Sequence, residues 1–249
     1  MWTRYGYAIL GHLLLLAAWQ IAVVVGKVPT FVLPSPGETL HALTAPNYRW
    51  TENVLATATE IFGGYSLAVV MAIFLAMVFC WFRHLEMLVM PVLVSLNMIP
   101  KVALGPLIIV WFKYGVGPNI LITFAICFFP IVLTTSRGLR EVEPDLLDLV
   151  HSLKGSRWQA FSKIQLPGAL PYVFSGMKVG AILAVVGAVV GEFLGSERGL
   201  GYLMMQVQVN LDTPAMFMAL LLITGLGVIL YGLVLLLERL VVPRDARIR

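Results

Sequence analysis

Charged residues are scarce in this sequence of 249 residues, because only 12% are Asp, Glu, Lys or Arg. A soluble domain carries about twice that share, so an ordinary soluble protein is excluded. Hydrophobic residues make up 59% of the chain, and its mean hydropathy is +0.90. Such a composition requires a hydrocarbon environment for much of the chain. The sequence therefore predicts an integral membrane protein.

Patterns typical of catalytic and metal sites are also missing. The chain has no Gly-x-x-x-x-Gly-Lys-Ser/Thr phosphate loop, no His-Glu-x-x-His and no Cys/His cluster. The four histidines are scattered, and Cys80 and Cys127 both lie in apolar runs, which argues against a disulfide framework. A membrane enzyme would need a clustered set of His, Asp, Ser or Cys residues. We therefore expect that this chain is not an enzyme and holds no metal or cofactor.

Hydrophobic runs predict an all-α, polytopic fold with about six transmembrane helices in one domain, residues 1–249. The spans are expected at residues 7–26, 60–82, 85–112, 119–136, 166–194 and 214–237. Each is near the length of about 20 residues that a helix needs to cross a bilayer. Proline interrupts the third span at Pro91, Pro100 and Pro106. The longest polar stretch is the loop at residues 137–165.

Basic residues are distributed unequally between the two sides that six spans define. Eleven lie on the side of the termini: Arg4, Arg83, Arg137, Arg140, Lys154, Arg157, Lys163, Arg239, Arg244, Arg247 and Arg249. Four lie on the other side: Lys27, Arg49, Lys113 and Arg198. The positive-inside rule places both termini and the loop 137–165 in the cytoplasm, with the chain in the cell inner (cytoplasmic) membrane. This topology accounts for the net charge of +4, so we expect a lipid bilayer and no nucleic acid as partner.

The cytoplasmic loop begins with a predicted amphipathic helix. Pro144 and Asp145 favour a helix start, because proline fits the first helical position and a carboxylate favours the positive end of the helix dipole. The apolar stripe consists of Leu146, Leu149, Val150 and Leu153. This helix either lies on lipid headgroups or contacts a partner protein. Its acidic residues, Asp145 and Asp148, favour the protein partner, since membrane-surface helices are rich in lysine.

A second short helix follows in the same loop. Gly155 breaks the first helix, and Ser156 with Gln159 has the spacing of a capping box. The new helix carries Trp158 and Phe161. Together the two helices predict a compact elbow beneath the membrane.

The loop resembles the EAA loop of binding-protein-dependent ABC importer permeases. The family pattern is Glu-Ala-Ala, three residues, Gly, nine residues, then an aliphatic residue, any residue, Leu and Pro. Counting back from Leu166-Pro167 puts Asp148-Leu149-Val150 at the Glu-Ala-Ala position and Lys154 at the glycine position, before Gly155-Ser156-Arg157-Trp158. Because lysine takes a positive φ less readily than glycine, we expect Gly155 to provide the turn.

Other motifs, in chain order, resemble the nitrate, taurine and alkanesulfonate branch of this family. They lie at residues 33–36, 99–107, 111–112, 129–131, 191–193 and 199–203, within a resemblance that covers nearly all of residues 30–240. The resemblance implies the type I ABC importer permease fold, with the elbow as the coupling helix of the loop. It also implies a permease homodimer, two ATP-binding cassette subunits that hold ATP and Mg, and an extracytoplasmic solute-binding protein.

The implied function is import of a small polar solute by alternating access. Relatives of this type handle nitrate, bicarbonate, taurine and alkanesulfonates, or pyrimidine thiamine precursors and riboflavin, so an anionic or heterocyclic solute is expected. The alternative is a stand-alone secondary transporter or channel. It would need coupling-ion ligands or a self-contained pore.

Polar residues within the predicted spans suggest where solute passes. Asn97, Pro100 and Lys101 lie near the middle of the third span, where they either line the translocation path or join helices. Glu192 lies at the outer end of the fifth span, where it acts as a gate or meets water. Lys178 is expected to reach lipid headgroups with its long side chain.

Small residues recur in the fifth predicted span. Gly176 and Gly180 are four residues apart, as are Gly187 and Gly191. This spacing lets helix backbones approach closely, so these glycines are expected to serve helix packing or subunit contact.

Overall fold

The computed structural model describes residues 2–142 and 144–242. Across these ranges its regular structure is helical and contains no strand, which confirms the predicted all-α class. Five segments of the described chain are long and apolar enough to cross a membrane. The first lies within α1 (Trp2–Gly26), and the others contain α3 (Trp50–Trp81), α6 (Val116–Arg140), α9 (Leu166–Gly195) and α11 (Thr213–Val241). This is the architecture of a multi-pass membrane protein.

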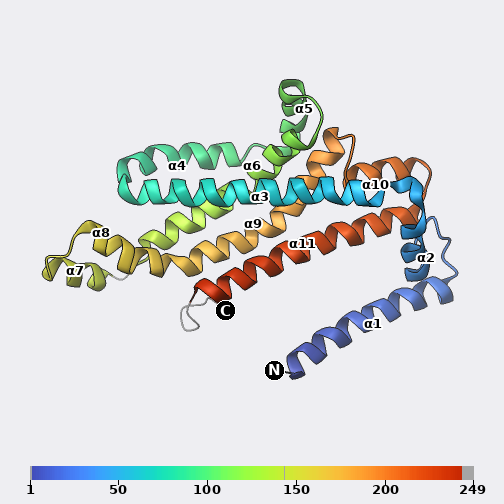
Figure 1. Ribbon diagram of the computed structural model, residues 1–249, viewed down its shortest axis with the longest axis horizontal. Coiled ribbons are helices and arrows are strands. Elements are labelled where there is room, and N and C mark those ends of the chain that lie inside the picture. The colour runs from blue at the N-terminus through green and yellow to red at the C-terminus, as the bar shows by residue number, and fades with distance from the viewer. Residues whose placement is uncertain (1, 143, 243–249) are drawn as a thin grey trace.

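The core lies where α3, α6 and α9 pack together (Figure 1). On α3, Ala68, Ala72 and Ala76 are four residues apart and fully buried. Small side chains on one face let neighbouring helices approach closely, which supplies van der Waals packing inside a bilayer. Ile131 of α6 and Ala184 of α9 belong to the same core. The helix α11 packs against α9, and the short helix α10 (Leu200–Val209) packs against both of them.

The predicted third span, 85–112, is not one continuous helix. It consists of α4 (Arg83–Asn97) and α5 (Lys101–Phe112), with the break directly at Pro100. Proline lacks a backbone N–H and restricts the residue before it, which explains why the helix ends there. In Figure 1, α4 lies alongside α3, whereas α5 turns away from it. That α4 and α5 together complete one membrane crossing stays a prediction.

Other boundaries differ from the predicted spans in smaller ways. The helix α3 begins at Trp50, ten residues before the predicted start, after a 3-10 turn at residues 46–48 and the left-handed residue Arg49. The surface helix α2 (Pro36–His41) begins at a capping box between Ser35 and Glu38. Arg244, Arg247 and Arg249 of the predicted cytoplasmic side lie outside the described residues.

The loop at 137–165 is almost entirely helical. The helix α6 continues to Arg140, and α7 (Pro144–Ser152) and α8 (Arg157–Ala160) follow. A π-helical turn (Phe161–Gln165) then runs without interruption into α9. We call residues 144–165 the elbow. Figure 1 shows the elbow at one end of the bundle, with α2 and α10 at the opposite end.

Candidate functional site

The first helix of the elbow ends in a left-handed turn at Lys154. Its φ is +55°, and the next amide, Gly155 N–H, donates to the carbonyl of Val150 at 2.8 Å. A bond across six residues that follows a left-handed residue is the Schellman ending of a helix. The expectation that Gly155 provides the turn is therefore wrong. The left-handed residue is Lys154, which stands where the family pattern has glycine.

Gly155 has a different role in the same turn. A Cβ atom at this position would lie 2.5 Å from Val150 Cγ1 and 3.0 Å from the Val150 carbonyl oxygen. The missing side chain therefore lets the chain fold back against the last turn of α7. Both residues of the turn were identified from the sequence, but the left-handed conformation was assigned to Gly155 instead of Lys154.

Replacing Lys154 with glycine should stabilise the elbow. Glycine adopts a positive φ at little steric cost, whereas an L-residue pays about 1 kcal/mol or more there, partly offset by the greater freedom of glycine in the unfolded chain. We expect hydrogen exchange at the last amides of α7 to slow by about two- to fivefold, equivalent to about 0.5–1 kcal/mol. Ser152→Gly, in the helical last turn, is the control and should speed exchange. Faster exchange in Lys154→Gly would contradict the assignment.

The second helix of the elbow is capped and anchored. Ser156 Oγ accepts from the amide of Gln159 at 3.2 Å, and the Ser156 amide donates to Gln159 Oε1 at 2.7 Å, which is the predicted capping box. Trp158 and Phe161 then pack with Trp81 at the end of α3, with ring centroids 5.6–6.2 Å apart. Aromatic contacts of this kind fix the elbow against the membrane-spanning helices.

The elbow also exposes large apolar side chains to the surroundings of the described chain. Leu149 is 54% exposed, Leu153 is 74% exposed and Trp158 is 62% exposed. Asp145 and Asp148 are exposed on the same short helix. A rigid segment with exposed large apolar side chains and a charged rim is typical of a protein-binding surface.

Two ion pairs lie next to the elbow, one within the end of α6 and one between α6 and α4. Arg137 donates to Glu141 at 3.0 Å, and this hydrogen bond lowers the pKa of the Glu141 carboxyl. Arg140 pairs with Glu86 of α4, whose side chain is only 7% exposed. This second pair was not predictable from the sequence, because its partners are 54 residues apart and on different helices.

The residues predicted for the translocation path form a local contact at the α4–α5 break. Lys101 Nζ donates to the Asn97 Oδ1 atom at 2.6 Å and to the Asn97 carbonyl oxygen. A cation at the C-terminus of a helix satisfies its last carbonyls and favours its dipole. Pro100 is exposed, and Asn97 and Lys101 are half-buried. The polar groups are thus gathered where the backbone is interrupted.

Glu192 of α9 lies in a buried polar cluster. Its side chain accepts from Thr57 Oγ1 at 2.5 Å, from the Tyr202 amide at 3.2 Å and from the Gly201 amide. Only 2% of Glu192 is exposed, so the interpretation that it meets water does not hold for this chain. Glu60 of α3 lies beside it, is fully buried and was not identified from the sequence.

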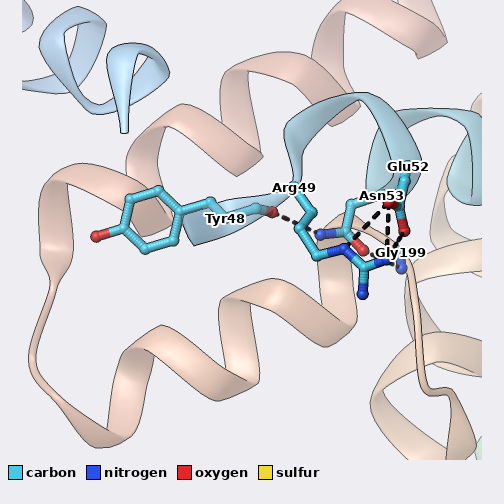
Figure 2. Close-up of polar contacts among 5 residues, drawn as sticks. All are labelled: Tyr48, Arg49, Glu52, Asn53 and Gly199. Atoms are coloured by element: carbon cyan, nitrogen blue, oxygen red, sulfur yellow. Dashed lines mark hydrogen bonds and ion pairs between the residues drawn. The ribbon is translucent and has the colours of Figure 1, made fainter. Parts of the chain in front are cut away.

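Two asparagines complete this arrangement. Asn119 Nδ2 donates to Glu60 Oε1 at 2.9 Å. Asn53 accepts from the Gly199 amide at 2.9 Å and donates to the Tyr48 carbonyl at 2.9 Å, as Figure 2 shows. We call Asn53, Thr57, Glu60, Asn119, Glu192 and the turn 199–202 the carboxyl cluster.

Lys178 does not reach headgroups as predicted. Its Nζ atom lies 2.9 Å from Glu238 Oε1 of α11, and the two side chains are only 20% and 7% exposed. Inside a bilayer a charged group finds a partner of opposite sign in preference to remaining alone. Glu238 lies 60 residues later in the chain, so the pairing depends on how α9 packs against α11.

The four glycines of α9 that were predicted to serve packing lie where a neighbouring helix comes close. A Cβ atom at Gly187 would be 2.8 Å from the Cα of Thr123, and one at Gly191 would be 2.8 Å from the side chain of Asn119. The same atom at Gly176 or Gly180 would collide with Thr134 or Ile131. All of these neighbours belong to α6. In this chain the glycines serve the contact between α6 and α9.

Comparison with known proteins gives a consistent result. The family model for a binding-protein-dependent transport system inner membrane component matches residues 60–243. The riboflavin transport system permease protein RibX of Chloroflexus aurantiacus is 37% identical, over 94% of this chain and 88% of that protein. The formylaminopyrimidine transport permease protein ThiX of Halalkalibacterium halodurans is 29% identical, over 93% of this chain and 92% of that protein.

A solved structure shares the fold. Inward-facing conformations of the MetNI methionine ABC transporter include a chain with a TM-score of 0.66 and 19% identity, covering 77% of this chain and 95% of that one. At this identity the likeness concerns the fold alone, and it confirms the predicted type I permease architecture.

Long apolar helices, a capped elbow at one end of the bundle and paired charges within the spans define a polytopic membrane transport subunit. The chain belongs to the family of binding-protein-dependent transport system inner membrane components. The resemblance found in the sequence is thereby confirmed. The protein is a permease subunit of an ABC importer and not an enzyme, and its family functions with a separate ATPase and a solute-binding protein.

Proposed function

We propose that two copies of this permease form a homodimer in the cytoplasmic membrane, each with its elbow against one of two ATP-binding cassette subunits. The exposed apolar face of the elbow carries this proposal. Leu149 projects from α7 and Leu153 from the turn that ends it, and the adjoining helix α8 is capped and packs on α3 through its aromatic side chain. ATP and Mg belong to the partner ATPase, and solute arrives from an extracytoplasmic binding protein.

Both termini and the elbow face the cytoplasm in this proposal. The positive-inside rule supports the orientation, because the side that carries the elbow has most of the basic residues. The end of the bundle with α2 and α10 then faces outward, where the binding protein docks. An elbow in the cytoplasm is on the side where ATP is available.

Transport follows alternating access. Closure of the ATPase dimer on ATP displaces both elbows, and the membrane helices that they join move with them. The continuity of α8, the π-helical turn and α9 supports this coupling, since no flexible linker interrupts the backbone between the elbow and a core helix.

The solute is small and polar, and either anionic or heterocyclic. The names of the relatives support this class, because RibX is named for riboflavin and ThiX for formylaminopyrimidine. Lys101 and Asn97 at the α4–α5 break, together with Glu192, are the residues proposed for the path or its gate. If Lys101→Ala and Asn97→Ala both left uptake intact, these two residues would have no place on the path.

A charge on the elbow tests the ATPase contact. In Leu153→Asp we expect the amount of ATPase subunit that co-purifies with the permease to fall about tenfold, a loss of about 1.4 kcal/mol, because a carboxylate must be desolvated at the interface. Val209→Asp is the matched control, since Val209 is 84% exposed at the opposite end of the bundle. It should leave co-purification unchanged.

The test also separates an importer subunit from a stand-alone transporter. Family membership favours the importer, and a stand-alone transporter would show uptake without any ATPase. Equal co-purification in both variants would place the ATPase contact elsewhere than on the elbow.

A further inference from the structure

We propose that Glu60 and Glu192 together bind one proton, carried by Glu60, and that this shared proton locks the turn between α9 and α10 onto α3 and α6. The inference concerns a buried binding site within the spans. It is independent of the solute and of the coupling elbow.

Glu192 has the environment of an ionised carboxylate. Three donors point at it: the Thr57 hydroxyl at 2.5 Å, the Tyr202 amide at 3.2 Å and the Gly201 amide. The two amides belong to the first turn of α10, where the helix dipole favours a negative charge. Charge-assisted hydrogen bonds of this kind are strongest when the acceptor is ionised.

Glu60 has the opposite environment. It is fully buried, and the one donor that the structure records for it is Asn119 Nδ2, at 2.9 Å from Oε1. Its other oxygen, Oε2, is buried without a donor. The two carboxyl groups are neighbours. Thr57, one turn before Glu60 on α3, donates to Glu192, and Asn119, the donor to Glu60, lies directly against Gly191. A proton on Glu60 turns a repulsive contact between two carboxylates into a hydrogen bond donated to Glu192.

No basic side chain offers an alternative way to balance the charges. The groups that face the two carboxyls are Asn53 and Thr57 from α3, Asn119 from α6, and the backbone amides of residues 199–202. Among the described residues, no Lys, Arg or His is recorded in contact with either carboxyl group. Two buried negative charges without a counter-charge are strongly unfavourable in a low dielectric, and one proton removes one of them.

The Glu60–Glu192 pair lies against the turn at residues 199–202, and the backbone of this turn leaves space for the Glu192 carboxyl group. Gly199 has a φ of +120°, and a Cβ atom there would lie 2.2 Å from the carboxyl carbon of Glu192. The amides of Gly199, Leu200 and Gly201 are bonded in succession to Asn53, Thr57 and Glu192. The start of α10 is therefore held through side chains of α3 and α9. Loss of the proton would bring two carboxylates into repulsion directly beneath this turn.

Two glutamine substitutions distinguish the partners. In Glu60→Gln the amide group still donates to Glu192 and still accepts from Asn119, so the melting temperature of the purified permease–ATPase complex should change by less than about 2 °C. In Glu192→Gln an NH₂ group replaces one of the two acceptor oxygens, so it faces either the Thr57 hydroxyl or the amides of Gly201 and Tyr202. The melting temperature should then fall by about 5 °C. An equal fall in both variants would overturn the assignment of the proton to Glu60.

Two further measurements address the proton directly. Infrared spectra of the wild-type complex should contain the carbonyl band of a buried, protonated carboxylic acid, and this band should be lost in Glu60→Gln. Raising the pH from 7 to 9 should lower the melting temperature of the wild type more than that of Glu60→Gln, because a proton bound only in the folded state is lost as the pH rises. Absence of the band, or stabilisation of the wild type by added NaCl but not by choline chloride, would assign the site to a metal cation instead.

Discussion

Replacing Lys178 with methionine is expected to lower the free energy of unfolding by about 3 kcal/mol, because it leaves the Glu238 carboxylate buried without a partner. The Glu238 side chain is only 7% exposed and lies between α9 and α11. Its single recorded ion pair within the described residues is the one with Lys178. The measurement is denaturant or thermal unfolding of the purified permease in detergent.

Two controls distinguish a broken pair from lost packing. The double variant Lys178→Met with Glu238→Leu removes both charges and should recover most of the stability. Arg49→Met breaks the Arg49–Glu52 pair, whose side chains are 70% and 50% exposed, and should cost less than about 1 kcal/mol. If the double variant were as unstable as Lys178→Met alone, the ion pair would not be the source of the effect.

A larger side chain at Gly187 is expected to be at least as damaging. Gly187→Leu should destabilise the protein by about 3 kcal/mol, because even a Cβ atom would lie 2.8 Å from the Cα of Thr123, and backbone yields less readily than a flexible side chain. We expect this variant to be poorly recovered from membranes. Gly187→Ala should give a smaller loss of the same sign, measured as a lower melting temperature.

Gly225 provides the matched control for this position. It is also a glycine within a long helix, α11, but no atom lies within 4 Å of the place where its Cβ would be. Gly225→Ala should therefore be neutral or slightly stabilising, since alanine favours a helix more than glycine does by about 1 kcal/mol. Equal losses at Gly187 and Gly225 would show that close contact between α6 and α9 is not what limits substitution.

Local features of the fold were predictable from the sequence. The Ser156–Gln159 capping box depends on neighbouring residues, and it is present where it was expected. The covalent structure of proline favours the break at Pro100. The interruptions predicted at Pro91 and Pro106 are wrong, because these prolines lie inside α4 and α5. Hydrophobic runs located the five long helices, although α3 begins earlier than its apolar run.

Contacts between distant segments were not predictable in this way. Glu60 lies at the start of a predicted span, where a carboxyl group normally meets water, and only the packing of α3 against α6 and α9 encloses it. Lys178 was assigned to the headgroups because its partner, Glu238, is far away in the chain. The error at the turn, where Lys154 and not Gly155 is left-handed, has a local cause. Either residue could take the left-handed position, and close contact of Gly155 with Val150 decides which one does.

The uninterrupted path of α9 has a mechanical consequence. Thirty residues at 1.5 Å each make a rod of about 45 Å, with the elbow at one end and Glu192 near the other. A tilt of about 5° at the elbow displaces the far end by about 4 Å, which is more than the length of a hydrogen bond. The hydrogen bonds of the carboxyl cluster therefore remain intact during such a tilt only if α3 and α6 tilt together with α9. With the cluster intact, we therefore expect α3, α6 and α9 to move as one rigid body.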